Sequence, residues 1–177
     1  HVDVDEDCVQ QVSCGGAHTV VVTRSGRLFV TGSGSCGQLG LGNSVGVESK
    51  GAFVSKFQEV VIPQGLGGHN MYTGGKRVAF AAAGEEFTCV VTRGDQEVFV
   101  FGLGNVGQLG NGRTSNSFDA VVVEGMSGKK TVSLVSGKTS TMALTEDGEI
   151  YVWGGKNDAM DDLGRGSSSS GVESASG

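Results

Sequence analysis

Two glycine-rich segments carry the spacing of a dinucleotide-binding fingerprint, Gly-x-Gly-x-x-Gly. One spans 32–37 and the other spans 102–107, and each follows a short apolar run. In a nucleotide-binding domain this pattern opens a helix whose N-terminus holds the pyrophosphate. Here further glycines follow each segment, and glycine strongly disfavours a helix. We therefore predict turns between strands and expect no cofactor.

The other residues that could do chemistry stand alone. His18 could act as a general base, but no nucleophile pattern lies near it, so a hydrogen bond to a neighbouring loop is favoured. The adjacent carboxylates Asp161 and Asp162 have no partner motif, and a solvated turn is expected there. The four cysteines include no C-x-x-C pair, and the three histidines complete no zinc spacing. We predict no catalytic residue, no metal site and no enzymatic activity.

The glycine segments are copies of one another. The segments 32–42 and 102–112 both end in Gly-Gln-Leu-Gly-x-Gly, and a degenerate third copy spans 154–166. Self-similarity over tens of residues is typical of propellers and other repeat arrays. The recurring glycines are therefore predicted to be architectural. They are Gly32, Gly37, Gly40, Gly42, Gly102, Gly107, Gly110, Gly112, Gly154, Gly164 and Gly166.

Each glycine segment follows two short runs of β-branched and aromatic residues, which favour strands. Turn residues join the two runs, as in Ser25-Gly26 and Asp147-Gly148, and predict a hairpin. Further candidate strands come before each hairpin, at 9–14, 78–83 and 132–136, and after the glycine loops, at 57–62 and 118–123. The pattern predicts an all-β fold, a partial β-propeller of about three blades of antiparallel strands.

The units are unevenly spaced, which suggests a domain organisation. Repeats are predicted at 9–63, 78–123 and 132–166, with an insertion around 43–76. An acidic lead-in occupies 1–8. The Ser/Gly-rich segment 167–177 has too few apolar residues to order itself and is predicted to be a disordered tail.

The insertion is the segment most specific to this chain. Loops on a rigid scaffold concentrate partner contacts. The candidate contact residues are Lys50, Phe53, Lys56, His69 and Tyr72. An equally supported interpretation is that Phe53 and Phe57 only begin the outer strand and that 65–75 is a connector.

Composition narrows the range of partners. The formal net charge is −6, and the sequence shows no basic stripe of the kind that phosphate contacts require. Direct nucleic-acid binding is therefore disfavoured, and an acidic surface would suit a basic protein. No apolar stretch approaches the length of a membrane span. Scattered cysteines without a disulfide framework favour an intracellular location, cytoplasmic or nuclear.

The repeated unit resembles the regulator of chromosome condensation repeat. The first copy carries Gly15, Thr19, Thr23, Gly26, Leu28, Gly32 and 37–42, and the second carries Gly84, Thr88, Thr92, Val98, Gly102 and 107–112. That family forms seven-bladed propellers, so the resemblance implies missing blades, supplied by the rest of the chain or by another polypeptide. The first motif of the family often has a histidine, which only His18 supplies; Phe87 and Ser140 replace it in the other units.

The resemblance leaves three functions open. The first is a non-enzymatic protein-interaction scaffold. The second is a guanine-nucleotide exchange factor for a small GTPase of the Ran type, which is the activity of the founding member on chromatin. The third is a regulatory propeller of a ubiquitin ligase or another multidomain protein. A fold alone does not decide among them.

Overall fold

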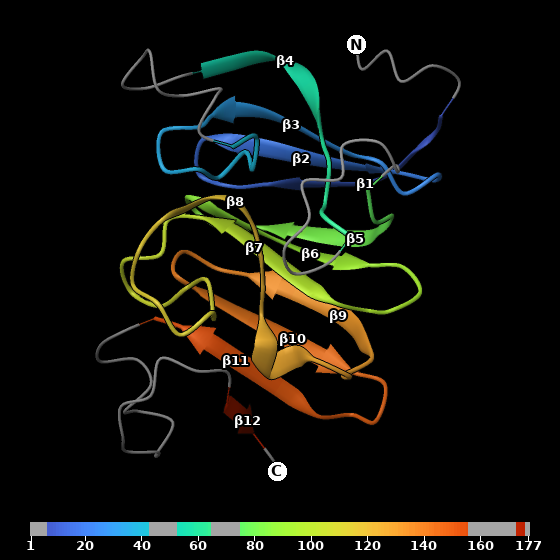
Figure 1. Cartoon of the computed structure of the whole chain (residues 1–177), viewed down its shortest axis with the longest axis vertical. Helices are drawn as coiled ribbons and strands as arrows, with labels where there is room; N and C mark the ends of the chain where they lie inside the picture. Colours follow the sequence, from blue (N-terminus) through green and yellow to red (C-terminus); the bar gives the residue numbers. More distant parts are fainter. Residues whose placement is uncertain (1–6, 43–52, 65–74, 156–172, 176–177) are drawn as a thin grey trace.

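The computed structural model describes residues 7–42, 53–64, 75–155 and 173–175. Three four-stranded antiparallel sheets are stacked face to face along the long axis of the molecule (Figure 1). The all-β partial propeller predicted from the sequence is confirmed, and each sheet is one blade. The strands of the first blade are β1 (Val9–Cys14), β2 (His18–Thr23), β3 (Leu28–Ser33) and β4 (Phe53–Val60); those of the second are β5 (Val78–Ala83), β6 (Phe87–Thr92), β7 (Val98–Gly102) and β8 (Ser117–Val122); those of the third are β9 (Thr131–Ser136), β10 (Ser140–Thr145), β11 (Ile150–Gly154) and β12 (Glu173–Ala175).

The outer strand of the first blade is longer than the sequence indicated. β4 begins at Phe53 and pairs along β3 from Ser33↔Phe53 to Leu28↔Val60. Ile62 was expected to close this strand, but it forms an isolated bridge with Lys76 instead. The open edge of β3 offers backbone partners along its whole length, so polar residues before 57 join the strand.

The predicted disordered tail needs a correction at three of its residues. Glu173–Ala175 form β12, which pairs with β11 from Ile150↔Ala175 to Val152↔Glu173. Composition pointed to disorder because these residues have little apolar surface to bury. Pairing with an exposed strand edge uses backbone groups alone, so it does not need that surface.

The blades pack through alternating faces of their strands. Val20, Val22, Leu28 and Val30 of the first blade share one buried cluster with Phe99 and other residues of the second blade. The opposite face of the second blade packs on the third blade in a second cluster, which contains Cys89, Val91, Val98, Val100, Leu134, Ala143, Tyr151 and Trp153. Successive residues of a strand point to opposite faces, so each central strand serves two interfaces.

Side chains join the innermost strands of the first two blades. The Gln11 amide accepts a hydrogen bond from the Ala81 N–H and donates one to the Ala81 carbonyl, both at 2.9 Å. The Ser13 hydroxyl accepts the Ala83 N–H at 3.0 Å. These bonds satisfy the free edge of β5 and hold the two blades in register.

Helical structure in the described part of the chain is limited to one 3-10 turn, η2 (Glu124–Met126). Met126 is buried against the second blade-to-blade cluster. None of the helices in these residues is long and apolar enough to cross a membrane.

Candidate interaction surfaces

The glycine-rich loops are turns with left-handed backbone. In the second loop, Gly102, Gly107, Gly110 and Gly112 have φ between 60° and 118°, a region that L side chains rarely adopt. The equivalent glycines of the first loop, and Gly154, also have positive φ. No helix follows either Gly-x-Gly-x-x-Gly segment in the residues described, so neither forms the usual pyrophosphate site. Gly164 and Gly166 lie outside the described residues.

The second glycine of each Gly-Gln-Leu-Gly-x-Gly loop packs against an aromatic ring of the next blade. A Cβ added at Gly40 would lie 2.8 Å from the Phe101 ring, and one at Gly110 would lie 2.6 Å from the Trp153 ring. Both rings are buried at the same position of the third strand. Glycine is therefore required there to let the aromatic ring of the next blade approach.

His18 is part of a hydrogen-bond chain between the first two blades. Its Nε2 lies 2.9 Å from the Thr88 hydroxyl, which donates to the Gln38 carbonyl at 2.9 Å. Because the Thr88 proton is used in that bond, His18 Nε2 must be the donor. The ring is 3% exposed, and burial lowers its pKa from 6.5 to about 4. The neutral imidazole donates to the Thr88 hydroxyl, whose own proton is used in the bond to Gln38, so both groups are engaged in structure.

The glutamines of the two intact loops are buried structural groups. Gln38 Oε1 accepts the Cys36 N–H at 2.8 Å, and Gln108 Oε1 accepts the Val106 N–H at 2.9 Å. Each side chain closes its own turn from inside. Sequence reasoning did not assign these glutamines a role, although their recurrence among glycines was the available signal.

The hairpin edge of the stack, defined by the β2–β3, β6–β7 and β10–β11 turns, repeats one charged arrangement. A cation lies over the third-strand aromatic ring in every blade: Arg27 over Phe29, Lys76 over Phe99 and Lys129 over Tyr151, with 4.8, 5.6 and 5.0 Å to the ring centroids. Each cation is also paired with at least one carboxylate. Cation–π contacts and ion pairs therefore close the same end of each blade.

The first and second blades carry a pair of opposite charges at corresponding positions, but with the signs reversed. In the second blade Lys76, just before β5, pairs with Glu97, just before β7. Burial opposes the charge on Lys76, but hydrogen bonds from its ammonium to Asp95 and Glu97 outweigh it and raise its pKa. The corresponding residues of the first blade are Asp7 and Arg27, with the signs reversed. Hydrogen bonds from Ser25 and Thr23, with a smaller contribution from Arg27, lower the pKa of Asp7.

The opposite edge carries a shallow groove of about 250 Å³ where the innermost strands of all three blades end. Cys14, Ser136 and Lys138 line it, and Lys138 pairs with Glu85 across it at 3.5 Å. No group of His, Cys, Asp or Glu in the described ranges is arranged to hold a metal ion. Away from this groove, burial raises the pKa of the Cys89 thiol to about 12, so it stays protonated.

Comparison with known proteins decides the family. Models of the regulator of chromosome condensation (RCC1) repeat match residues 9–38 and 95–144. The chain belongs to the RCC1 repeat family. It is 34% identical to the X-linked retinitis pigmentosa GTPase regulator of Canis lupus familiaris over 150 residues, and 30% identical to the human E3 ubiquitin-protein ligase HERC2 over 148 residues. The crystal structure of human WBSCR16 superposes with a TM-score of 0.78 at 22% identity, which supports the fold alone.

These RCC1 relatives are much longer than the chain. The matches cover 84% and 82% of the chain but only 13% of the GTPase regulator and 3% of HERC2. The match to WBSCR16 covers 99% of the chain and 42% of that structure. The chain therefore corresponds to a small part of the curated relatives it matches.

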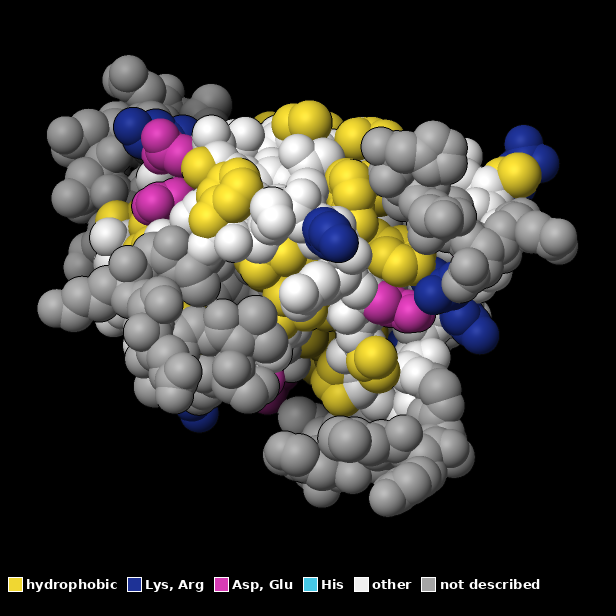
Figure 2. Space-filling view, turned by 90° about the horizontal axis from the view of Figure 1, so that it is seen from above, with side chains coloured by type: hydrophobic (Ala, Val, Ile, Leu, Met, Phe, Trp, Pro, Cys, Tyr) yellow, Lys and Arg dark blue, Asp and Glu magenta, His cyan; other side chains and the backbone are white. Residues whose placement is uncertain are grey.

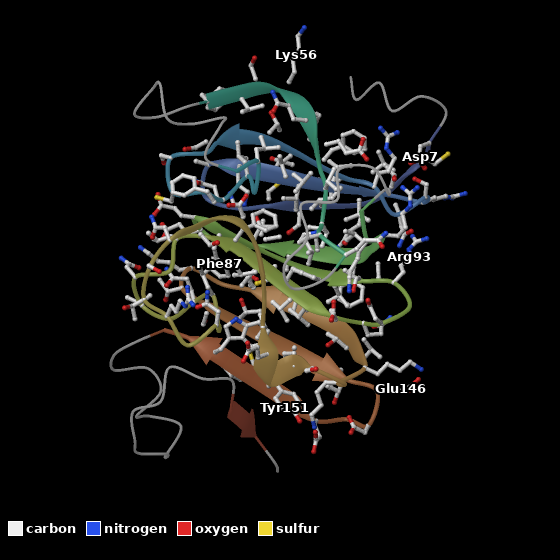
Figure 3. The ribbon with its side chains drawn as sticks, viewed as in Figure 1. Asp7, Lys56, Phe87, Arg93, Glu146 and Tyr151 are labelled. Atoms are coloured by element: carbon white, nitrogen blue, oxygen red, sulfur yellow. The ribbon has the colours of Figure 1, made fainter. Side chains whose placement is uncertain are left out.

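Two of the predicted contact residues lie on the outer strand of the first RCC1 blade. Phe53 is 70% exposed at the start of β4, and Lys56 projects from β4 away from the stack (Figure 3). Lys50, His69 and Tyr72 lie outside the described residues, so the set as a whole stays a prediction. Figure 2 looks down onto this blade and shows hydrophobic side chains between grey segments.

The outward face of the third RCC1 blade is apolar and open. Met142, Leu144 and Ile150 are 49%, 39% and 38% exposed. Their equivalents in the first blade, Val20, Val22 and Leu28, are each 1% exposed because the second blade covers them. In the third blade Met142 also lies opposite Val135 and Val152. This face has the apolar composition of a blade-to-blade interface, and no further blade covers it among the described residues.

Proposed function

We propose that the chain is part of a larger RCC1 propeller that binds protein partners and catalyses no reaction. The proposal rests on one observation: the residues that could take part in catalysis are instead engaged in hydrogen bonds between blades or buried in the core. His18 and Thr88 are bonded to each other between blades, and Cys89 is a buried, protonated thiol. The family supports a binding role, because RCC1 repeats occur in relatives named as a GTPase regulator and as a ubiquitin ligase.

Quantitative co-purification of the full-length protein with its cellular partners tests the binding role. The changes Phe53→Ser and Lys56→Glu should lower partner recovery without altering the unfolding midpoint, because both side chains are exposed. A matched control is Arg113→Glu, which changes an exposed residue in the loop between β7 and β8, away from β4. If no protein is recovered above the level of an unrelated propeller, the binding role is wrong. If recovery is unchanged in both variants, Phe53 and Lys56 serve only the outer strand.

The missing blades form a second part of the proposal. A further RCC1 repeat would cover Met142, Leu144 and Ile150 as the second blade covers Val20, Val22 and Leu28. Met142→Glu should then cost less than about 0.5 kcal/mol in this chain, where the side chain is exposed, and about 2–5 kcal/mol in the longer natural protein. Urea unfolding of both forms measures the two costs. Equal costs would contradict a covering blade.

The GTPase-regulator relative supports a second function, guanine-nucleotide exchange on a small GTPase of the Ran type. An exchange factor stabilises the nucleotide-free GTPase and needs shape and polar contacts more than a reaction centre. Release of a fluorescent guanine nucleotide from a panel of small GTPases tests it. Acceleration by the full-length protein supports exchange, and no acceleration removes it.

The 30% identity to HERC2 supports a third function, that of a regulatory propeller inside a ubiquitin ligase or another multidomain protein. The complete reading frame on both sides of the chain tests it, because a ligase requires an appended catalytic domain. We also propose an intracellular location, which the four free cysteines support because a reducing compartment keeps thiols unpaired. Fluorescence microscopy of the tagged full-length protein tests that location.

A further inference from the structure

Three exposed arginines gather on the hairpin edge at the seam between the first two blades. Arg24 follows β2, Arg77 precedes β5 and Arg93 follows β6. The Arg93 N–H donates to the Arg77 carbonyl at 2.7 Å, which places these two residues side by side. We call Arg24, Arg77 and Arg93 the arginine patch.

The first blade brings Arg24 to the same place. The Val78 N–H donates to the Gly26 carbonyl at 2.8 Å, and a Cβ added at Gly26 would lie 2.9 Å from the Arg77 Cβ. Arg24 is in the same turn as Gly26. Ordered strands and turns of both blades therefore hold the patch, and Figure 3 shows Arg93 on this edge.

The arginine patch differs from its surroundings in charge pairing. The other cations of the hairpin edge are paired with carboxylates: Arg27, Lys76, Lys129 and Lys130. Within the described ranges, the structure shows no carboxylate paired with any of the three patch arginines.

Arg93 is oriented by neutral acceptors. Its Nε donates to the Val78 carbonyl at 3.1 Å, and one terminal nitrogen donates to Gln10 Oε1 at 3.0 Å. A guanidinium has five N–H donors in a planar fork, so Arg93 keeps donors for a ligand while its position is held. Such a fork matches the two oxygens of a carboxylate.

We propose that the arginine patch binds an acidic segment of a protein partner, with its aspartate or glutamate carboxylates on the guanidinium groups. This inference rests on the proposed binding function and adds the chemistry of the partner. Asp7 and Asp95 lie on the same edge and stay ionised. Burial opposes the charge on Asp95, but hydrogen bonds from Lys76 and Thr92 outweigh it and lower its pKa. Hydrogen bonds from Ser25 and Thr23 lower the pKa of Asp7. Long polyanions such as nucleic acids would meet these charges, whereas a short segment with a few carboxylates can avoid them.

Fluorescence anisotropy with the full chain tests the proposal. The probe is a fluorescein-labelled peptide of alternating glutamate and serine, and the control probe has glutamine in place of glutamate. We expect the glutamate peptide to bind, with an affinity that falls as salt is raised. Arg24→Ala and Arg77→Ala should each weaken binding about tenfold, because each removes a charge-assisted contact. Among the described residues, neither the Arg24 nor the Arg77 side chain makes an ion pair, so folding should be unaffected, which circular dichroism checks.

The test includes a matched variant and four results that would change the assignment of the patch. Arg113→Ala, on the opposite edge, should leave the affinity unchanged. Equal binding of the glutamine peptide, or no binding of the glutamate peptide, overturns the proposal. Tighter binding of a single-stranded oligonucleotide with the same arginine dependence assigns the patch to nucleic acid instead. If deleting residues 1–6 alone raises the peptide affinity more than about tenfold, the patch serves the chain's own acidic lead-in. The co-purification experiment on Phe53 and Lys56 is independent of all these outcomes.

Discussion

Replacing Gly110 with alanine should destabilise the chain more than the same change at Gly112, two positions along the same loop. Both glycines have positive φ, 60° and 74°, so both changes carry a backbone cost of about 1–2 kcal/mol. The new methyl group has different surroundings. At Gly112 the added Cβ would have no atom within 4 Å apart from its own chain neighbours, whereas at Gly110 it would lie 2.6 Å from the Trp153 ring.

The difference between the two variants isolates the contact between blades. Trp153 is 1% exposed and must shift to admit the methyl group, which typically costs about 1–3 kcal/mol in a packed core. We therefore expect Gly110→Ala to cost about 2–5 kcal/mol and Gly112→Ala about 1–2 kcal/mol. The loss of glycine flexibility in the unfolded chain is common to both and cancels.

Urea unfolding followed by tryptophan fluorescence measures this difference, because Trp153 is the only tryptophan of the chain. Far-UV circular dichroism reports the same transition in a Gly110→Ala, Trp153→Leu double variant. A smaller side chain should accept the methyl group, so the two changes should couple by about 1 kcal/mol or more. Equal costs for Gly110→Ala and Gly112→Ala would refute the matching of loop glycine to aromatic ring.

Three further predictions follow from buried or paired polar groups. Burial lowers the pKa of His18 from 6.5 to about 4 on folding, so the unfolded chain takes up a proton first as pH falls. About 3 kcal/mol of stability is complete above pH 6.5 and should be lost as the pH falls to 4. Urea unfolding at several pH values should show a smaller loss in His18→Gln. Lys76→Glu and Glu97→Lys should each lower the free energy of unfolding by about 1–2 kcal/mol in thermal unfolding. The double variant Lys76→Glu, Glu97→Lys should recover most of that loss. No recovery would mean that the ion pair does not hold this edge. Gln11→Ala should cost about 1–3 kcal/mol in urea unfolding because it leaves the Ala81 backbone groups unpaired. Gln10→Ala, at an exposed site, should cost much less. Equal losses in the two variants would contradict the role of Gln11.

Local sequence predicted the hairpins well. The apolar runs ending in Thr23 and Gly102 became the strands β2 and β7, and Ser25-Gly26 became a turn with Gly26 at φ 85°. These features depend on strand propensity and on the backbone freedom of glycine, which act over a few residues. The outer strands were less predictable, since β4 and β12 take their length from the free edge of the strand beside them.

The candidate surfaces were less predictable than the strands. The inserted segment suggested five contact residues, of which only Phe53 and Lys56 fall in the described part of the chain. The arginine patch was missed because Arg24 and Arg77 are far apart in the sequence and carry no motif. Their proximity depends on how Gly26 packs on Val78, which is a contact between blades.

The sequence by itself determined the repeat, the strands and the turns, because each is set by residue types over a few neighbouring positions. Only the tertiary structure decided which residues meet between blades: His18 with Thr88, Gly110 with Trp153, and Arg77 with the turn that carries Arg24. Those contacts join residues about forty to seventy positions apart, and side-chain shape and hydrogen-bond geometry select them after the blades stack. The exposed apolar face of the third blade is interpreted in the same way. We read it as an interface because the equivalent faces of the first two blades are buried.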